Sequence, residues 1–185
     1  MTATLLTADD YIATGDTRPR WTELINGEVI VNSPTFRHQA AVSYIHYRLM
    51  DWTLNGPNRG TTPGQLDFKF DNGNVLAPDV TWISGEISLD AAVQNFSPDL
   101  AVEVRSPSTW RYDTTVKFRI YEAAGVAEVW LVDSASKSVL VYRRSTPTRP
   151  DFDIALELSQ GETLETPLLP EFSLDITAVF SHPNS

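Results

Sequence analysis

The chain has 185 residues, of which 42% are hydrophobic and 21% charged, a composition typical of a globular protein with one hydrophobic core. It contains no cysteine, which excludes disulfide bonds, thiolate zinc sites and a cysteine nucleophile. Its formal net charge of −10 opposes non-specific DNA binding, because such binding depends on neutralising phosphates with Lys and Arg. A locally basic groove is still compatible with this charge, since net charge averages over all faces.

The N-terminal sequence and the longest apolar runs bear on cellular location. The N-terminal stretch has no basic segment followed by an apolar one, so we expect no signal peptide. The apolar runs fall far short of the roughly 18 to 20 residues that a membrane-spanning helix needs. We therefore expect a single cytoplasmic domain, residues 1–185, without membrane association.

The first part of the chain predicts a short helix, a β-hairpin and a long helix. Residues 7–14 begin with a capping-box pattern, which predicts a short helix. Two β-rich runs within 21–31 surround Asn26-Gly27, the strongest short signal for a hairpin. Ser33-Pro34 then precedes apolar residues at helical spacing, and Asn55-Gly56-Pro57 ends that helix.

The rest of the chain alternates strands and helices. The predicted strands are 66–70, 80–83, 100–105, 126–132, 139–142 and 152–158, and the predicted helices are 88–93, 110–124 and a weak one from about Asp175. The strand–helix–strand order across 100–132 indicates a right-handed parallel crossover. With hairpins before and after it, this order predicts an α/β fold with a central mixed sheet flanked by helices.

Glu103 is the notable residue of the strand 100–105. Side chains alternate along a strand, so Leu100 and Val104 face one way while Glu103 and Arg105 face the other. If that second face is buried, the carboxylate needs a metal, a lysine or an arginine as its partner. If the face is solvated, Glu103 is simply exposed, and the alternation fits both readings.

Two Pro-Asp pairs offer a second acid, and strand geometry separates them. Asp99 lies four positions before Glu103, roughly 13 Å away at about 3.3 Å per residue. That is too far for both carboxylates to hold one ion at ~2.1 Å. Asp79 precedes a different strand and can lie beside Glu103. We therefore expect Asp79 to share a site with Glu103 and Asp99 to cap its strand.

Lys117 lies within the predicted helix 110–124. Asp113 precedes it by four residues, which by itself favours an ordinary surface ion pair. In a metal site, the same ammonium group can orient a water molecule or stabilise charge in the transition state.

The segments that together carry a family resemblance are Pro78-Asp79, 98–108 and 117–133, with 23–28, Ser33-Pro34 and His38 nearer the N-terminus. In this order they resemble the "putative restriction endonuclease" family, a bacterial, cyanobacteria-rich branch of the PD-(D/E)XK nuclease superfamily. The resemblance covers about residues 11–142. It rests on the ordered set, because a single Pro-Asp or Glu-x-Lys match is weak evidence.

The resemblance implies a restriction-endonuclease-like core with N-terminal and C-terminal hairpin additions. It also implies a Mg²⁺ site, with Mn²⁺ as a substitute, in which Asp79 and Glu103 bind the metal. The superfamily pattern has lysine two residues after the second acid, where this chain has Arg105. Arginine is too basic to act as a general base. The resemblance implies that in this family the lysine has moved to the following helix, so that Lys117 is expected to be the third catalytic residue.

Further residues are candidates for supporting roles. Arg105 has a planar guanidinium suited to clamping a phosphate. His38, near a helix start, and Tyr121, one helical turn after Lys117, are candidate substrate contacts. Glu28 or Glu23 of the hairpin can supply an accessory acid, as such acids do in this superfamily.

Two classes of function therefore remain open. The first is a Mg²⁺-dependent endonuclease, a homodimer that hydrolyses DNA phosphodiesters, or those of another nucleic acid such as RNA, with a metal-activated water. The second is a catalytically inactive binding or assembly module on the same fold, which the net charge of −10 and Arg105 favour.

Overall fold

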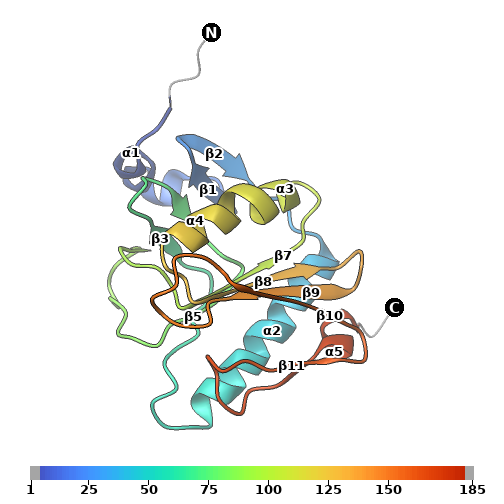
Figure 1. Cartoon of the computed structure of the whole chain (residues 1–185). Coiled ribbons are helices and arrows are strands. Elements are labelled where there is room, and N and C mark those ends of the chain that lie inside the picture. The colour runs from blue at the N-terminus through green and yellow to red at the C-terminus, as the bar shows by residue number, and fades with distance from the viewer. Residues whose placement is uncertain (1–4, 182–185) are drawn as a thin grey trace.

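The computed structural model describes residues 5–181, which form two five-stranded sheets, a two-stranded sheet and flanking helices (Figure 1). The first sheet consists, in order, of β2 (Glu28–Val31), β1 (Thr22–Ile25), β4 (Val75–Leu76), β3 (Asp67–Lys69) and β6 (Val93–Gln94). The second consists of β10 (Ile154–Ser159), β9 (Ser138–Arg143), β8 (Glu128–Asp133), β7 (Leu100–Val104) and β5 (Val80–Trp82). β11 (Thr163–Leu164) pairs with β12 (Leu174–Asp175). The predicted α/β class is confirmed, with the strands divided between two mixed sheets.

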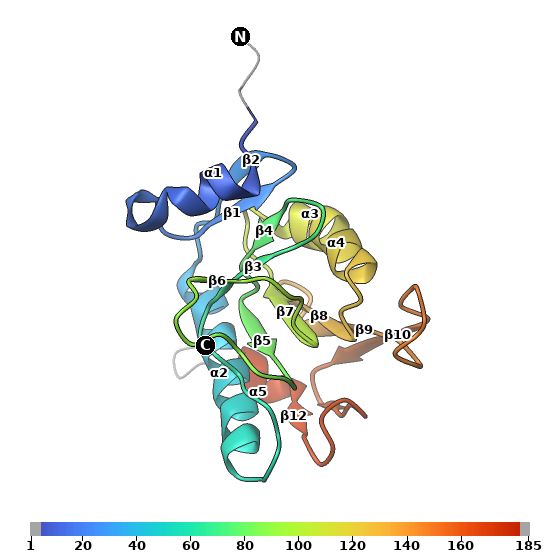
Figure 2. The same ribbon diagram turned by 90° about the vertical axis from the view of Figure 1, so that its left-hand side faces the viewer.

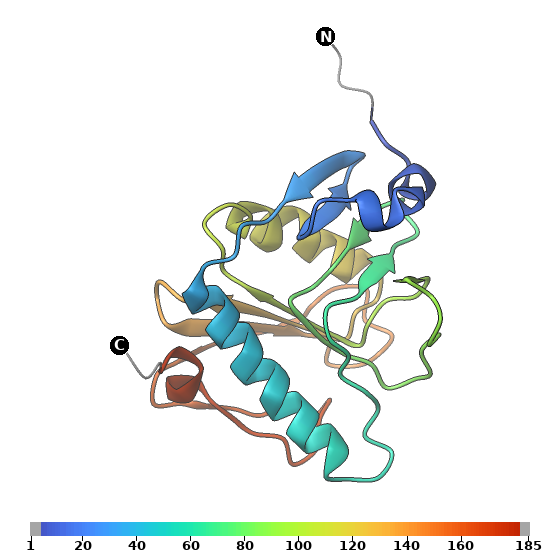
Figure 3. The same cartoon turned by 180° about the vertical axis from the view of Figure 1, so that it is seen from behind.

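Helices cover both faces of the second sheet. α2 (Phe36–Leu54) and α5 (Ile176–Phe180) lie on one face, and α3 (Trp110–Tyr112) and α4 (Phe118–Ala123) on the other (Figures 1 and 3). α1 (Ala8–Ala13), which the 3₁₀ turn η1 (Gly15–Thr17) follows, lies beside the β1–β2 hairpin (Figure 2). None of the helices in the described part of the chain is long and apolar enough to cross a membrane.

The alternation of β7 separates two hydrophobic cores. Leu100, Val102 and Val104 pack in the core that includes Ile45 of α2. Ala101 belongs to the other core, on the side of α3 and α4. Glu103 shares the parity of Ala101, as the sequence predicted, so its carboxylate points toward these helices.

The crossover between β7 and β8 is parallel, as predicted, with the pairing running from Leu100↔Glu128 to Val104↔Val132. The predicted helix 110–124 forms, but a π-helical turn, η2 (Asp113–Lys117), interrupts it between α3 and α4. π-helical turns inside α-helices are rare overall, but those that occur are often found at functional sites. This turn contributes two charged residues to the site described below.

The hairpin prediction is confirmed in detail. Thr22 pairs with Val31 and Ile25 with Glu28 across an antiparallel ladder. Asn26 and Gly27 have φ of 52° and 81°, and such a pair of left-handed residues matches the twist of the flanking strands.

The prediction of a helix at 88–93 is wrong. This segment forms turns that lead into β6, and the buried side chain of Gln94 binds carbonyl oxygens that backbone N–H groups would bind in a helix. Its amide nitrogen donates to the carbonyl oxygens of Ser88 and Ala91 at 3.1 and 3.2 Å. Strand β4 was not predicted; its two residues close a hairpin with β3.

Candidate active site

A buried cluster of charged residues joins the two sheets. Lys117 Nζ lies 2.7 Å from Glu103 Oε1 of β7, 3.0 Å from Glu23 Oε1 of β1 and 3.2 Å from Asp113 Oδ1. All four residues are buried. The pair of Lys117 and Asp113 is therefore no surface ion pair, and the solvent-exposed reading of Glu103 is wrong.

The π-helical turn places three side chains of one helix toward this cluster. Asp113 and Lys117 are its first and last residues, and Tyr121 follows one turn later in α4. Thr109 Oγ1 donates to Asp113 Oδ2 at 3.1 Å, which holds the second oxygen of that carboxylate. Local spacing alone predicted the contact between Asp113 and Lys117, but gave no sign that it would be buried.

Asp79 reaches the site from the neighbouring strand. β5 and β7 are antiparallel, with Val80 opposite Val102, so one more step of the register sets Asp79 beside Glu103. Its negative charge contributes to raising the pKa of Glu103. Asp99 instead accepts hydrogen bonds from Ser84 N and Oγ at 2.7 and 2.9 Å, away from the cluster.

One oxygen of Asp79 is fixed by two donors. Oδ2 lies 3.1 Å from His38 Nε2 and accepts a hydrogen bond from Val104 N at 2.8 Å. Among the hydrogen bonds of the described residues, none involves Oδ1 of Asp79. His38, predicted as a substrate contact, is 1% exposed, and its ring contacts Asp79.

Glu103 is held in the same manner. Its Oε1 contacts Lys117 Nζ and accepts a hydrogen bond from the Tyr121 hydroxyl. No hydrogen bond to Oε2 occurs within residues 5–181. Tyr121, predicted as a substrate contact, is fully buried, with its hydroxyl directed at Glu103.

Each of the two acids thus keeps one carboxylate oxygen uncommitted. Within the part of the chain that is described, no three His, Cys, Asp or Glu side chains are grouped to hold a metal ion. Mg²⁺, however, is commonly bound through one or two carboxylates, with water and substrate phosphate completing its octahedron. The donor set of Asp79 and Glu103 fits that mode of binding.

The cluster combines burial with an excess of negative charge. Burial raises the pKa of Glu103 well above its ordinary value; Lys117 opposes this, while Asp113, Glu23 and Asp79 add to it. Burial lowers the pKa of Lys117, but the surrounding carboxylates outweigh this and raise it well above the usual range. Lys117 therefore carries a proton at neutral pH and cannot act as a base there.

Glu23, rather than Glu28, is the hairpin acid of the site. Glu23 faces the cluster from β1, and its Oε1 also accepts a hydrogen bond from Ala77 N at 2.7 Å. Glu28 is exposed at the start of β2, so its predicted role as accessory acid is not supported by its position.

Arg105 lies just beyond the end of β7 and contacts Asp133 of β8. Its Nη1 donates to both carboxylate oxygens of Asp133 at 2.9 Å. The Arg105 side chain is 38% exposed, and its remaining nitrogens make no hydrogen bond with any described residue. The guanidinium can therefore still donate to a phosphate while Asp133 orients it.

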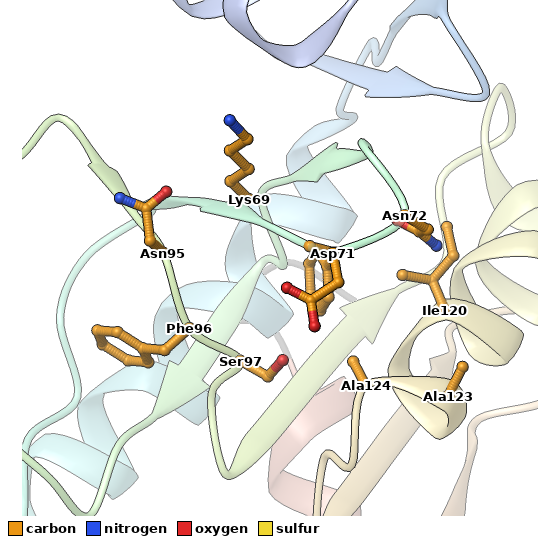
Figure 4. Close-up of a pocket in the computed structure, with 10 residues that line it drawn as sticks. Lys69, Asp71, Asn72, Asn95, Phe96, Ser97, Ile120, Ala123 and Ala124 are labelled. Carbon is orange, nitrogen blue, oxygen red and sulfur yellow. The ribbon is translucent and has the colours of Figure 1, made fainter.

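Two hollows of the surface differ in their relation to the cluster. Asp79 lines a pocket of about 190 Å³ together with Trp21, His46 and Gln65, among others. The pocket of about 330 Å³ in Figure 4 is bordered by the turn after β3, residues 95–97 and the end of α4. It shares no residue with the charged cluster, so we take the pocket at Asp79 as the opening of the site.

Comparison with known proteins places the chain in a family. The chain belongs to the Uma2 family, described as "Putative restriction endonuclease", whose model matches residues 8–177. This confirms the resemblance noted from the sequence. Comparison with curated proteins gave no match.

A solved structure has the same fold. The crystal structure of "a putative nuclease belonging to DUF820" from Anabaena variabilis ATCC 29413 matches with a TM-score of 0.77 and 21% sequence identity. The match covers 95% of this chain and 97% of that one. At this identity the likeness establishes the fold, and the function must be argued from the site.

Proposed function

We propose that this protein is a Mg²⁺-dependent endonuclease that hydrolyses phosphodiester bonds of DNA. Its family membership supports a nuclease. The observation that carries the proposal is the pair of uncommitted oxygens on two adjacent carboxylates, Oδ1 of Asp79 and Oε2 of Glu103. Each carboxylate is fixed through its other oxygen, so the free oxygens are oriented before any ligand arrives.

In this proposal Asp79 and Glu103 hold Mg²⁺, or Mn²⁺ in its place. The bound ion would lower the pKa of a coordinated water and neutralise charge on the phosphate. The excess of carboxylates over Lys117 favours a divalent cation, because such a cation offsets the burial and the carboxylate repulsion that together raise the pKa of Glu103.

The remaining residues orient groups and carry charge. Lys117, protonated and 2.7 Å from Glu103, fixes that acid and supplies positive charge toward the phosphate. Tyr121 holds the same carboxylate from α4, and His38 holds Asp79. Arg105 would donate to a neighbouring phosphate from its exposed side.

One observation favours the second function, a binding or assembly module without turnover. Lys117 is engaged by three carboxylates at once, which is also what a purely structural ion-pair cluster would show. The two functions differ in whether the site takes up a divalent ion.

The proposal extends to the substrate, the oligomeric state and the cellular location of the protein. RNA is the alternative to DNA, because the site recognises a phosphodiester that both contain. We propose a homodimer, since two-fold dimers are the commonest closed assemblies of oligomeric proteins. Multi-angle light scattering would test this. A cytoplasmic location accords with these substrates.

The test is a cleavage assay on supercoiled plasmid and on single-stranded DNA and RNA, with Mg²⁺, Mn²⁺ or EDTA. The wild type should cleave only with metal, and Asp79→Asn should not cleave. Asp99→Asn is the matched control, because Asp99 belongs to the other Pro-Asp pair and lies outside the cluster. Absence of cleavage in every metal, with no heat of metal binding by calorimetry, would favour the binding module.

A further inference from the structure

Trp21 lines two hollows of the surface, one of which is the opening of the site. It lines the pocket of about 190 Å³ that contains Asp79. It also lines a neighbouring hollow of about 450 Å³, together with Arg18, Arg20 and Gln65. Since Trp21 and Gln65 line both, the two hollows adjoin, and Trp21 is shared by the hollow that contains Asp79 and the one that contains the two arginines.

The conformation of Trp21 is unusual for its size. Its φ is 62°, in the left-handed region where a bulky residue is a genuine outlier. Its carbonyl oxygen accepts a hydrogen bond from Asn32 N at 2.8 Å, so the backbone is anchored there by the end of the hairpin. Strained residues persist where the surrounding structure enforces them, and they cluster at functional sites.

The exposure of this tryptophan also indicates a functional role. Trp21 is 43% exposed, whereas Trp52, Trp82 and Trp130 are buried. A large part of Trp21 thus remains open to solvent, although its backbone conformation is unfavourable. The exposed part of the side chain is available to a ligand at the opening of the site.

The charges around the ring indicate the ligand. Arg18 is paired with Asp67 at 2.8 Å, whereas Arg20 is exposed and makes no hydrogen bond or ion pair with any residue that the structure describes. An aromatic face beside a free guanidinium suits a nucleic-acid strand, with a base on the ring and a phosphate on the cation. In a duplex the bases are already stacked on one another and do not offer their faces.

We propose that Trp21 is a stacking platform for an unpaired base of a single-stranded nucleic acid, whose backbone passes from Arg20 toward Asp79. The inference rests on the proposed function, because it assumes that the strand reaching Asp79 is a nuclease substrate. It also explains how a protein with a net charge of −10 can bind a nucleic acid. Stacking on one ring is sequence-tolerant and needs few phosphate contacts, so a broad basic surface is not required.

The experiment measures binding without cleavage. Fluorescence anisotropy in EDTA would compare a labelled oligothymidylate with a labelled duplex of equal length, using the full chain. We expect the single strand to bind more tightly than the duplex. Trp21→Leu should weaken single-strand binding by roughly tenfold or more, while Trp21→Phe, which keeps an aromatic face, should retain most of it. Arg20→Gln should weaken binding and reduce the slope of log K against log salt by about 0.7, corresponding to one phosphate.

Two controls separate stacking from folding. Tyr47→Leu removes another exposed aromatic side chain, 62% exposed on α2, and should leave binding unchanged. Trp21→Gly should keep or raise the melting temperature, because glycine adopts φ of 62° without strain, yet it should lose single-strand binding. A purely structural Trp21 would instead show a lowered melting temperature in this variant.

The inference is overturned if Trp21→Leu binds the single strand like the wild type, or if the duplex binds more tightly and does so independently of Trp21. These outcomes are distinct from failure of the nuclease proposal. Cleavage that is unaffected by Trp21→Leu would reject the platform and keep the nuclease. Single-strand binding that depends on Trp21 in a chain that never cleaves would keep the platform and reject the nuclease.

Discussion

Lys117 Nζ lies 2.7 Å from Glu103 Oε1, and both side chains are only 3% exposed. Their Cα atoms belong to different elements, β7 and the π-helical turn η2, so the contact ties the crossover helix to the sheet beneath it. Further contacts with Glu23 and Asp113 make Lys117 the single ammonium group among several carboxylates. The stability of the fold and the chemistry of the site therefore depend on the same side chain.

Replacing Lys117 should destabilise the protein strongly. Lys117→Met leaves buried carboxylates without their cation, and breaking a buried pair in this way costs about 3 to 5 kcal/mol. Urea unfolding in EDTA would measure the loss. Lys69→Met is the control, because Lys69 pairs with Asp9 at the surface and such pairs are worth up to about 1 kcal/mol. Equal effects of the two substitutions would contradict a buried role for Lys117.

The pH dependence of stability should change when Glu103 is neutralised. Burial raises the pKa of Glu103 well above its ordinary value of 4.5, so at pH values between 4.5 and that raised pKa this carboxyl takes up a proton on folding. Its contribution to stability is present at acid pH and is lost as the pH rises from 4.5 through the raised pKa. Glu103→Gln should thus gain stability relative to the wild type as the pH rises, while losing activity.

Urea unfolding in EDTA at mildly acidic and mildly alkaline pH would check this sign. The exposed Glu157→Gln is the control, and its difference from the wild type should stay nearly constant with pH. A Glu103→Gln variant that instead loses stability relative to the wild type as the pH rises would show that the carboxylate is favourably compensated by Lys117.

Tyr121 should affect the rate of cleavage through Glu103. Tyr121→Phe keeps the buried ring but removes the hydroxyl that donates to Glu103. Because a hydrogen bond to a charged group is worth about 1.5 to 3 kcal/mol, we expect the rate to fall by roughly tenfold or more with the fold retained. Tyr142→Phe is the control, since that hydroxyl makes no hydrogen bond with any described residue. Equal rates in the two variants would remove Tyr121 from the site.

Arg105 should act on binding rather than on turnover. Its exposed guanidinium is held by Asp133 beside the site, so Arg105→Gln should raise KM about 2- to 5-fold and leave kcat nearly unchanged. Steady-state cleavage of an oligonucleotide would test this. Arg149→Gln, at a surface position 46% exposed, is the control. A fall in kcat with an unchanged KM would show that Arg105 stabilises the transition state.

Periodicity predicted those parts of the site that depend on local geometry. The alternation of β7 gave the direction of Glu103, and strand spacing selected Asp79 over Asp99. The register between β5 and β7 agrees with that choice. Burial of Glu103 was left open, because alternation fits a half-solvated strand as well as a buried one.

The remaining parts depend on contacts far apart in the chain. Glu23 reaches Lys117 across 94 positions, and only the packing of the hairpin against η2 shows that Glu23, and not Glu28, faces the site. The π-helical turn likewise has no signal in residues 110–124, whose pattern is that of an ordinary helix. It becomes explicable once Asp113 and Lys117 are seen to be buried together.

The most direct test of the metal site is a crystal structure with Mn²⁺, located by its anomalous scattering. We predict one ion bound by Oδ1 of Asp79 and Oε2 of Glu103, with Lys117 still contacting Glu103 and water in the other positions. Crystals of Asp79→Asn should show a greatly weakened peak. An ion held elsewhere, or no ion at Asp79 and Glu103 in saturating Mn²⁺, would contradict the assignment of these two acids as the metal site.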